Sequence, residues 1–483
     1  MNILIVAYEG APFYKRGGLG DVVESLPKAL VKIGIDVRVI IPYYNEIRDE
    51  YHLKKEGEFA VTFESHLEQV GIFSSLLPNT KVPFYFLANT TYLFSSNPHG
   101  KNKRIDQFAF FNLAVVHFMQ WVEKQHRWTP SLVHCNDWHT ALIPLILRKK
   151  AKSSIPTLLT IHNLLYQGVG SLKVLDLLNM KDEETKELKR GKPATEINVL
   201  GEGIVHATRV STVSRSYAKE IMGDYDQTPI SIFLKEREEE QHEKDGEIIG
   251  ILNGIDYDIW SPANDEYIFH KYDSKNWEIG KKDNKQDLLK DLGLSDRPTF
   301  CFVGRMANQK GVDILIKVMD GLESLNINMI ILGVGSLIIQ ENVLKLAQKH
   351  PSWVRAEPIY SEEFAHRLHA GSDFIVIPSR YEPCGLIQMI AMKYGTLPIA
   401  SNTGGLKDSI RNGRNGFLFR KNSFRALLKA IKKALSLYER PKEFEMMVVN
   451  ALKTDFSWEK SAKLYKKLYL KIIKSNKNPQ VLT

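Results

Sequence analysis

The sequence predicts an α/β protein of two domains, each built on a parallel β-sheet with helices on both faces. The chain has 483 residues, which is more than a single hydrophobic core usually organises. Short apolar segments alternate with amphipathic helical segments, as in parallel sheets. This alternation begins near residue 3 and begins again near residue 299. We therefore expect two similar α/β domains in one chain.

The first domain opens with a strand, a loop and a helix. Residues 3–7 form an apolar run suited to a buried parallel strand, and the glycine-containing loop 9–20 follows. Asp21 and Glu24 have the spacing of a capping box. Apolar residues then recur on one helical face until Gly34 ends the helix. Further strands are predicted at 37–41, 132–135, 157–161 and 209–213.

The second domain repeats this pattern. A strand at 299–303 leads into the loop 304–311, and an amphipathic helix is predicted from Val312 to Leu322. Further strands are predicted at 329–332, 374–377 and 397–400.

Two polar segments lie between these patterns. The charge run 235–247 predicts a solvated loop, and the stretch 265–296 predicts a surface segment beyond a hinge near Gly254. We expect a first domain at 1–255, a second at 256–456, and a C-terminal helix at 457–483 that packs against the first.

Charge and cysteine content narrow the class of protein. The net charge of +9 suggests an anionic partner. The basic segment 463–477 keeps its apolar residues at helical spacing, which favours a solvated helix face over a nucleic-acid site. No segment approaches the ~18 apolar residues of a membrane span, and the N-terminus resembles a core strand rather than a signal peptide. Three widely spaced cysteines argue against a disulfide framework or a metal site and favour a reducing cytoplasm.

The loop 15–21, Lys-Arg-Gly-Gly-Leu-Gly-Asp, is the first segment that indicates chemistry. Glycines let a ligand approach the backbone closely, and N–H groups at a helix start attract anions. A dinucleotide-binding turn is the alternative. It needs Gly-x-Gly-x-x-Gly spacing and an acidic residue after the second strand, where this chain has Pro42-Tyr43. We therefore do not predict a dehydrogenase.

The segment 303–311, Val-Gly-Arg-Met-Ala-Asn-Gln-Lys-Gly, is the second. Arg305 and Lys310 flank a predicted strand-to-helix turn. Two cations and a helix N-terminus, which carries about half a positive charge, can stabilise a diphosphate leaving group without a metal. The alternative is that both are surface charges.

The segment 378–386, Pro-Ser-Arg-Tyr-Glu-Pro-Cys-Gly-Leu, is the third. Glu382 follows a buried strand and is suited to accept hydrogen bonds from sugar hydroxyls. The backbone amides that follow it are suited to face phosphate. The alternative is that Glu382 caps the next helix.

In this order and spacing, the three segments resemble those of bacterial-type glycogen synthases, which are relatives of plant starch synthases. The resemblance covers nearly the whole chain, including 136–139 (Asn-Asp-Trp-His), 160–164 (Thr-Ile-His-Asn-Leu), 253–256 (Asn-Gly-Ile-Asp) and 403–406 (Thr-Gly-Gly-Leu). It implies the GT-B architecture, with two Rossmann-like domains facing across a cleft. It also implies a retaining enzyme, without a cofactor, that moves glucose from ADP-glucose or UDP-glucose to the non-reducing end of an α-1,4-glucan.

The resemblance implies roles for individual residues. The implied catalytic residues are His162, Glu382, Asp21, Arg305 and Lys310. The donor would be held by Lys15, Gly17, Gly18, Arg305, Lys310, Tyr360, Glu382, Cys384, Gly385 and Leu386, with Tyr360 stacking on the base. The acceptor would be held by Asp137, Asn163 and Asn198, although a helix cap is an equal alternative for Asp137. We expect the cations at 15, 305 and 310 to converge on one pyrophosphate between the domains.

Three positions depart from the family pattern. Gly201 stands where many members have lysine, Ile390 where tyrosine is usual, and Ser401 where arginine is common. These changes leave base preference and acceptor length open. No carboxylate nucleophile is evident at the motif positions. This favours same-face attack, with the leaving phosphate accepting the acceptor's proton.

Two rival functions remain. A sucrose- or lipid-directed GT-B enzyme would often carry a second glutamate at position 390, which is isoleucine here. A catalytically silent glucan-binding protein would be expected to have lost its phosphate-binding residues, which are present. We predict neither a nucleic-acid nor a membrane partner, and the sequence leaves the oligomeric state open.

Overall fold

The computed structural model describes residues 1–93, 101–180, 195–223, 230–240, 247–359, 361–420 and 423–477. Tyr360, which was predicted to stack on the base, lies outside the described residues. The chain divides into two compact units. Unit 1 comprises Met1–Val213, Ala218–Ile251 and Trp458–Thr483, and unit 2 comprises Ser214–Tyr217 and Leu252–Ser457. Among the described residues, no helix combines the length and the apolar character needed to cross a membrane.

Unit 1 contains a nine-stranded sheet in the order β11-β10-β7-β6-β1-β2-β5-β4-β3. Neighbouring strands from β11 to β5 are parallel, whereas β3 and β4 form an antiparallel hairpin that joins β5. The predicted parallel strands are confirmed. The hairpin was not predicted, because its many charged residues obscure the alternation of a half-buried strand. The strands of unit 1 are β1 Asn2–Val6, β2 Asp36–Pro42, β3 Lys54–Phe63, β4 His66–Leu76, β5 Pro83–Ala88, β6 Leu132–Asn136, β7 Thr157–Ile161, β8 Val169–Ser171, β9 Glu196–Asn198, β10 Arg209–Thr212 and β11 Ile249–Gly250.

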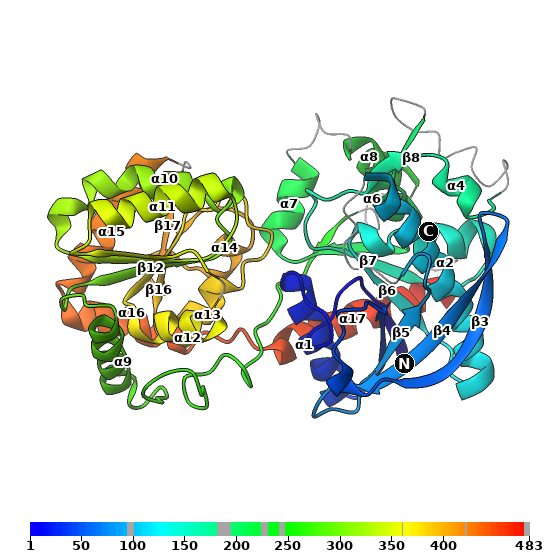
Figure 1. The fold of residues 1–483 in the computed structure, drawn as a ribbon, viewed down its shortest axis with the longest axis horizontal. Coiled ribbons are helices and arrows are strands. Elements are labelled where there is room, and N and C mark those ends of the chain that lie inside the picture. The colour runs from blue at the N-terminus through cyan, green and yellow to red at the C-terminus, as the bar shows by residue number, and fades with distance from the viewer. Residues whose placement is uncertain are drawn as a thin grey trace. The chain divides into compact units, whose positions relative to one another are not determined.

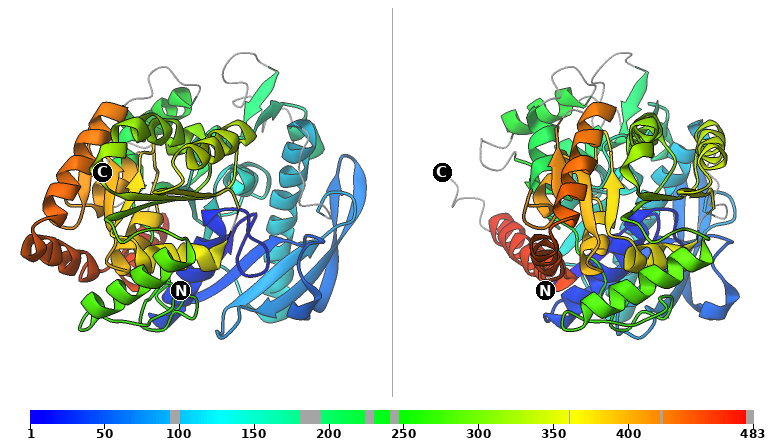
Figure 2. Two further views of the ribbon diagram at one scale, coloured as in Figure 1. Left: turned by 60° about the vertical axis from the view of Figure 1, so that its left-hand side comes forward. Right: turned by 90° about the vertical axis from the view of Figure 1, so that its left-hand side faces the viewer.

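A helix from each end of the chain packs on one face of this sheet. α1 (Gly18–Lys32) and α17 (Trp458–Lys477) lie against each other (Figures 1 and 2), and both contribute to one buried apolar cluster with β1 and β2. Tyr465 and Tyr469 are fully buried in this cluster, whereas most lysines of α17 are exposed. The predicted solvated basic helix face is therefore confirmed. The other helices of this region are α2 Lys101–His126, α3 Leu142–Leu145, α4 Val174–Leu177, α6 Val199–His206, α7 Arg215–Gly223 and α8 Ser231–Glu240.

The capping box predicted at the start of α1 is wrong. The helix begins at Gly18, so Asp21 lies within its first turn, and no side chain caps the preceding Gly17. Asp21 instead pairs with Lys15 at 2.6 Å. The glycines let the helix begin earlier than the polar pattern predicts, which places Asp21 where an acidic residue favours the helix dipole.

The solvated loop predicted at 235–247 is also wrong over its first part. Residues 235–240 belong to α8, and Arg237 is fully buried there. Its guanidinium donates to the carbonyl oxygens of Ile204 at 2.7 Å and Ala207 at 2.8 Å. Carbonyls at the end of α6 lack helical partners, so they are available as acceptors for the buried cation. Residues 241–246 lie outside the described residues.

Unit 2 contains a six-stranded parallel sheet in the order β14-β13-β12-β15-β16-β17. Figure 1 shows α10 and α11 on one face and α12, α13 and α16 on the other. The predicted helix from Val312 is α-helical only to Val318 and continues as short 3₁₀ turns. The strands are β12 Thr299–Val303, β13 Asn328–Leu332, β14 Val354–Glu357, β15 Phe374–Ile377, β16 Leu397–Ser401 and β17 Phe417–Phe419. The helices are α9 Trp277–Asp291, α10 Val312–Val318, α11 Leu337–Lys349, α12 Glu362–Gly371, α13 Ile387–Lys393, α14 Gly404–Ser409, α15 Phe424–Tyr438 and α16 Pro441–Leu452.

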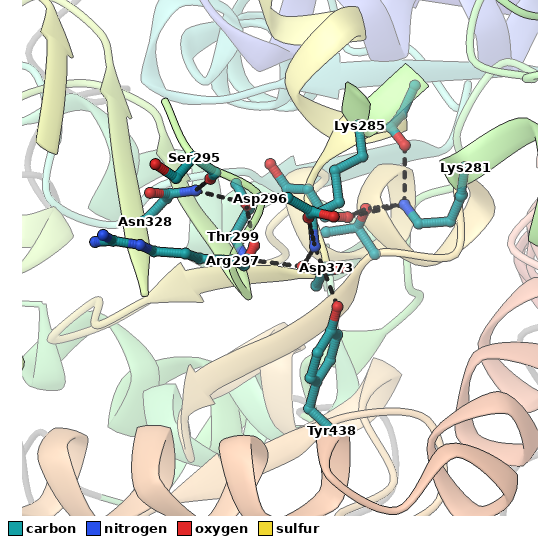
Figure 3. Close-up of polar contacts among 12 residues, drawn as sticks. Lys281, Lys285, Ser295, Asp296, Arg297, Thr299, Asn328, Asp373 and Tyr438 are labelled. Atoms are coloured by element: carbon teal, nitrogen blue, oxygen red, sulfur yellow. Dashed lines mark hydrogen bonds and ion pairs between the residues drawn. The ribbon is translucent and has the colours of Figure 1, made fainter. Parts of the chain in front are cut away.

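The polar stretch 265–296 lies largely at the surface, as predicted, but it is also anchored in the unit. It contains α9, whose lysines reach into a polar network at the N-terminal ends of the strands (Figure 3). Lys285 pairs with Asp373 at 2.7 Å, and the same Asp373 oxygen accepts the Thr299 N–H at 2.7 Å. Lys281 is 8% exposed and donates to main-chain carbonyls. Because buried polar groups of this kind need fixed partners, the segment is an integral part of the unit.

Candidate functional site

In unit 2 the loops after β12 and β15 meet at the carboxyl ends of these paired strands. Nζ of Lys310, in the first loop, lies 2.6 Å from Oε2 of Glu382, in the second. The same carboxylate oxygen accepts a hydrogen bond from Oγ of Ser379 at 2.9 Å. Ligands of open parallel sheets bind at this edge, so the structure brings two of the predicted donor-binding residues together there.

The pair of Lys310 and Glu382 is largely withdrawn from solvent. The side chain of Glu382 is 8% exposed and that of Lys310 is 21% exposed. Lys310 is therefore not a simple surface charge. Glu382 does not cap α13 either, because the N-cap position belongs to Leu386. An ammonium group has three donors, and Glu382 uses one of them, so Lys310 keeps donors for a bound anion.

Two glycines let neighbouring segments pack directly against the backbone of the loop that contains Glu382. Gly311 has φ +68°, and a Cβ atom there would lie 2.0 Å from the carbonyl oxygen of Pro378. Gly404 has φ +43°, and its Cβ atom would lie 2.0 Å from the carbonyl oxygen of Glu382. The Gly405 N–H donates to that oxygen at 2.9 Å. Only glycine fits such contacts, so the segments at 311 and 403–406 position Glu382.

Arg305 lies on the exposed side of the same loop. Its guanidinium donates to the side-chain oxygen of Gln309 at 3.2 Å. The carbonyl of Gln309 accepts the Arg380 N–H at 2.8 Å, and Arg380 pairs with Asp313 at 2.7 Å. Arg305 is thus an exposed cation. Its loop is held to the loop after β15 by the backbone hydrogen bond of Arg380, and Arg380 also pairs with Asp313.

The residues after Glu382 can contact a ligand through their backbone groups rather than through reactive side chains. Burial raises the pKa of the Cys384 thiol to about 12, so this thiol is neutral and a poor nucleophile. Gly385 has φ +69°, and Leu386 immediately precedes α13.

In unit 1 a buried carboxylate holds the glycine-rich loop. Oε2 of Glu9 accepts hydrogen bonds from the backbone N–H groups of Arg16 and Gly17, the second at 2.9 Å. Glu9 is fully buried, and burial raises the pKa of its carboxyl despite these two donors. Two backbone donors of the loop therefore already have a side-chain acceptor. The loop also carries the pair of Lys15 and Asp21, whose side chains are 38% and 35% exposed.

Asp137 and His162 follow the neighbouring strands β6 and β7. Oδ1 of Asp137 accepts the His162 N–H at 2.7 Å and the Asn163 N–H at 3.3 Å. Burial raises the pKa of Asp137 from 3.8 to about 7, against the effect of these two N–H groups. Asp137 occupies the N-cap position of the short 3₁₀ turn Trp138–Thr140, as the alternative predicted, but its side chain makes no capping hydrogen bond there. Asp137 therefore ties the loop after β6 to the loop after β7.

The imidazole of His162 is neutral at physiological pH. Burial lowers its pKa to about 3, because a low-dielectric environment disfavours the charged ring. Its Nε2 lies 2.9 Å from Oδ1 of Asn136. A neutral imidazole offers one donor and one acceptor, so His162 can orient a hydroxyl but does not supply a positive charge.

The two predicted acceptor-side asparagines differ. Asn163 is partly exposed, and its Oδ1 accepts the Leu165 N–H at 3.1 Å. Asn198 caps α6 by accepting the Gly201 N–H at 2.9 Å, and its Nδ2 donates to Gln167 at 2.6 Å. Because both ends of its amide are engaged, nothing in this geometry favours an acceptor role for Asn198, which stays a prediction.

The three departures from the family pattern lie in the core. A Cβ atom on Gly201 would lie 2.5 Å from the ring of Phe233, so the packing of this chain leaves no room for lysine. Ile390 and Ser401 are buried, with 5% and 1% exposure. All three positions are therefore enclosed by the packing of the chain itself.

Most of the predicted residues that the structure describes thus follow strands of the main sheet of their own unit, whereas Asn198 ends β9 in a separate two-stranded sheet. Glu9, Asn136 and Ser379 were not predicted from the sequence, although each makes a hydrogen bond that holds a predicted residue in place. A signal was present for each, because each is a polar residue within three positions of the end of an apolar strand.

Comparison with known proteins agrees with this architecture. The family model described as "Starch synthase catalytic domain" matches residues 2–236, and the one described as "Glycosyl transferases group 1" matches residues 284–448. The glycogen synthase of Thermotoga petrophila is 35% identical, with coverage of 98% of this chain and 99% of the relative. The catalytic domain of starch synthase IV from Arabidopsis thaliana, solved with ADP and acarbose, is 30% identical, has a TM-score of 0.86, and covers 98% of this chain and 99% of its own.

A more distant structure shares the fold alone. Sucrose-phosphate synthase from Thermosynechococcus elongatus is 17% identical, with a TM-score of 0.62 and coverage of 98% and 99% of the two chains. Two units with parallel sheets flanked by helices, together with these likenesses, define the GT-B fold of glycosyltransferases. The chain belongs to the glycogen and starch synthase family. It is a retaining glucosyltransferase that adds glucose to α-1,4-glucan.

Proposed function

We propose that this glucosyltransferase uses ADP-glucose in preference to UDP-glucose and extends the non-reducing ends of α-1,4-glucans. Full-length similarity to bacterial glycogen synthases supports this donor, as does the plant starch synthase solved with ADP. The observation that carries the assignment of the site is the buried pair of Lys310 and Glu382 at the edge where ligands bind.

The residues of unit 2 would hold the donor. Arg305 and the remaining donors of Lys310 bind the diphosphate, which gains negative charge as the glycosidic bond breaks. Glu382 accepts hydrogen bonds from glucose hydroxyls, and its position is kept by Lys310 and Ser379. The backbone at Cys384, Gly385 and Leu386 completes the donor contacts. We keep Tyr360 as the residue that stacks on the base.

The residues of unit 1 would act on the sugar and the acceptor. Lys15, Gly17 and Gly18 contact the donor, and Asp21 keeps Lys15 in place through their ion pair. His162 orients the glucose through a hydroxyl. Asp137 and Asn163 shape the acceptor side, because Asp137 holds the backbone of residues 162 and 163.

The proposed mechanism is same-face substitution. The bond from the anomeric carbon to the diphosphate breaks, the acceptor hydroxyl attacks from the same face, and the departing phosphate takes the hydroxyl's proton. The enzyme then contributes by positioning and by stabilising the diphosphate charge. Mass spectrometry of protein mixed with donor alone would oppose this mechanism if it detected a glycosyl–enzyme adduct.

Donor preference is tested by initial rates with ADP-glucose and UDP-glucose on a glycogen primer. We expect a higher kcat/KM for ADP-glucose. In Glu382→Ala we expect transfer to fall with either donor, because removing a group that contacts the transition state typically costs roughly 100-fold or more in kcat. Faster turnover of UDP-glucose by the wild type would overturn the preference.

A glucan-binding protein without activity is the alternative from a different class. It predicts that the wild type binds glycogen but releases no nucleotide from either donor in the presence of primer. The described residues favour the enzyme, because Lys15, Arg305, Lys310 and Glu382 are placed at the strand ends.

Two further expectations remain proposals. The chain would act in the reducing cytoplasm, since its three cysteines are free and buried. The segments 1–255 with 457–483, and 256–456, would be the functional domains, the first serving the acceptor and the second the donor. Separate mutation of Asp137 and Arg305, with KM measured for each substrate, tests this division.

A further inference from the structure

The amide of Asn136 has a single possible orientation. Asn136 is the last residue of β6 and is 2% exposed. Its Nδ2 donates to the carbonyl oxygens of Val6 at 3.0 Å and His134 at 3.3 Å. The reversed amide would place Oδ1 against two oxygens that have no proton to share. Oδ1 therefore faces His162.

This orientation decides which ring nitrogen of His162 carries the proton. Oδ1 of Asn136 only accepts, and it lies 2.9 Å from Nε2 of His162, so Nε2 must be the donor. The ring is neutral, because burial lowers its pKa to about 3. Its Nδ1 is then unprotonated and carries a lone pair. Among the described residues, the structure shows no hydrogen bond to Nδ1.

No other described side chain competes for this ring. His134 makes its own hydrogen bonds to Thr160 at 2.6 Å and Tyr469 at 2.8 Å. Burial lowers the pKa of His134 to about 3, so it adds no charge beside His162. Asp137 contacts the backbone of His162 rather than its ring.

We propose that Asn136 is a positioning residue that holds the proton of His162 on Nε2, so that Nδ1 accepts a hydrogen bond from a hydroxyl of the bound glucose. The inference rests on the proposed role of His162 in orienting the donor sugar. The hydroxyl must then donate to Nδ1, which leaves its lone pairs for another donor and fixes the direction of the hydrogen-bond chain. Such preorganisation needs no rearrangement during the reaction.

The first test uses the wild-type protein without substrate. Two-bond proton–nitrogen correlation spectra of the nitrogen-15-labelled full chain, with His162→Gln to assign the ring, report the tautomer directly. We expect a protonated Nε2 and an unprotonated Nδ1 across neutral pH. A proton on Nδ1, an equal mixture of tautomers or a charged ring would overturn the proposal.

The second test changes the partner. In Asn136→Asp one carboxylate oxygen would accept the Nε2–H and also stabilise the charged imidazolium. The other oxygen would replace Nδ2 beside the carbonyl oxygens of Val6 and His134, so this variant should also lose stability. Nδ1 would then gain a proton as the pH falls, and kcat would decline by roughly 10- to 100-fold and recover at higher pH. We expect KM for glycogen to change little. An unaltered pH profile with an unaltered ring spectrum would contradict the proposal.

Asn112 provides a matched control in the same unit. It is 1% exposed, its Nδ2 donates to the carbonyl of His139 at 2.7 Å, and its Oδ1 accepts the N–H groups of Leu142 and Ile143 at 3.0 Å. Asn112→Asp therefore introduces an equally buried carboxylate away from His162. We expect it to lower stability and leave the pH dependence of kcat unchanged. An equal pH shift in both variants would assign the effect to general destabilisation and overturn the proposal.

Failure of the proposed function would look different. If the wild type turned over neither donor while its spectrum showed the Nε2–H tautomer, the glucosyltransferase function would fail and the control of the tautomer by Asn136 would stand. If Asn136→Asp did not fold, the wild-type spectrum would still decide the tautomer. Asn136→Ala, which removes the acceptor, should then show a mixture of both forms.

Discussion

Nζ of Lys310 lies 2.6 Å from Oε2 of Glu382, and this largely buried ion pair joins the loops that follow β12 and β15. Lys310→Met should leave the carboxylate of Glu382 without its cation. Breaking a buried pair from one side typically costs about 3–5 kcal/mol, and the 21% exposure of Lys310 places this pair at the lower end. Urea unfolding measures that loss, and initial rates should show a larger fall in kcat than the stability change explains, because the diphosphate loses a cation.

The double variant Lys310→Met/Glu382→Gln separates these two effects. It removes both charges, so it should recover much of the lost stability without recovering transfer. Asp313→Asn is the control, because it breaks the more exposed pair between Asp313, in the first turn of α10, and Arg380, in the loop after β15. It should cost about 1 kcal/mol or less and leave kcat close to that of the wild type. Equal losses of activity in all of these variants would argue against a direct role for Lys310.

Gly311→Ala tests whether the close approach behind this pair is required. A Cβ atom at Gly311 meets the carbonyl oxygen of Pro378 at 2.0 Å, whereas one at Gly34 meets nothing within 4 Å, although both residues have positive φ. Gly34→Ala should therefore cost only the backbone strain, about 1 kcal/mol. Gly311→Ala should cost more and also reduce kcat, because the loop must move. Thermal unfolding and initial rates of both variants provide the comparison, and equal effects would contradict it.

The difference between what the sequence predicted and what it missed has a physical basis. The parallel strands and the residues that follow them were predictable, because a buried strand leaves a continuous apolar run and Glu382 comes directly after one. The partner of Glu382 was not predictable. Its contact with Lys310 joins residues 72 positions apart in sequence and depends on the register between two strands.

Segments rich in charged residues were misjudged for a related reason. Arg237 and Lys281 are buried, although their neighbours in sequence are mostly polar. Each is satisfied by main-chain carbonyls supplied from other elements. A local pattern of charge indicates solvent exposure on average, but it contains no information about carbonyls that lie elsewhere in the chain.

Asp137→Asn should separate stability from function. The pKa of Asp137 rises from 3.8 to about 7 through burial, so between these values the folded state binds more protons than the unfolded state. Stability of the wild type should therefore fall as pH rises through this window. Asp137→Asn lacks this effect, so its free energy of unfolding relative to the wild type should increase from acidic to neutral pH by at most ~4 kcal/mol.

The same substitution should reduce transfer to the glucan, because the amide holds the backbone of His162 less strongly than a carboxylate does. Chemical unfolding at several pH values and KM for glycogen measure the two effects. Asp176→Asn, on the exposed side of α4, should change neither. If Asp137→Asn were instead less stable than the wild type at neutral pH, the ionised carboxylate of Asp137 would be making more favourable hydrogen bonds than its raised pKa indicates.

Lys281→Met should change stability while leaving catalysis intact. Lys281 lies in the polar network at the N-terminal ends of the unit 2 strands (Figure 3), whereas Glu382 follows the carboxyl end of β15. Its Nζ donates to the carbonyl of Ser372 at 2.9 Å and to Oγ1 of Thr396 at 2.8 Å. Methionine would remove this buried donor from its acceptors, although the Thr396 hydroxyl still donates to the Ser372 carbonyl at 2.9 Å, and the cost should be roughly 1–3 kcal/mol.

The pH dependence of this cost has a defined sign. Burial lowers the pKa of Lys281 from 10.5 to about 7, so above neutral pH the unfolded state binds more protons than the folded state. The contribution of this lysine to stability should therefore rise with pH from about 7 to about 10, and Lys281→Met should lack that rise. Unfolding experiments across this range test the slope, and initial rates at neutral pH should match those of the wild type. A fall in kcat as large as that of Lys310→Met would mean that the polar network at the far edge controls the loops of the site.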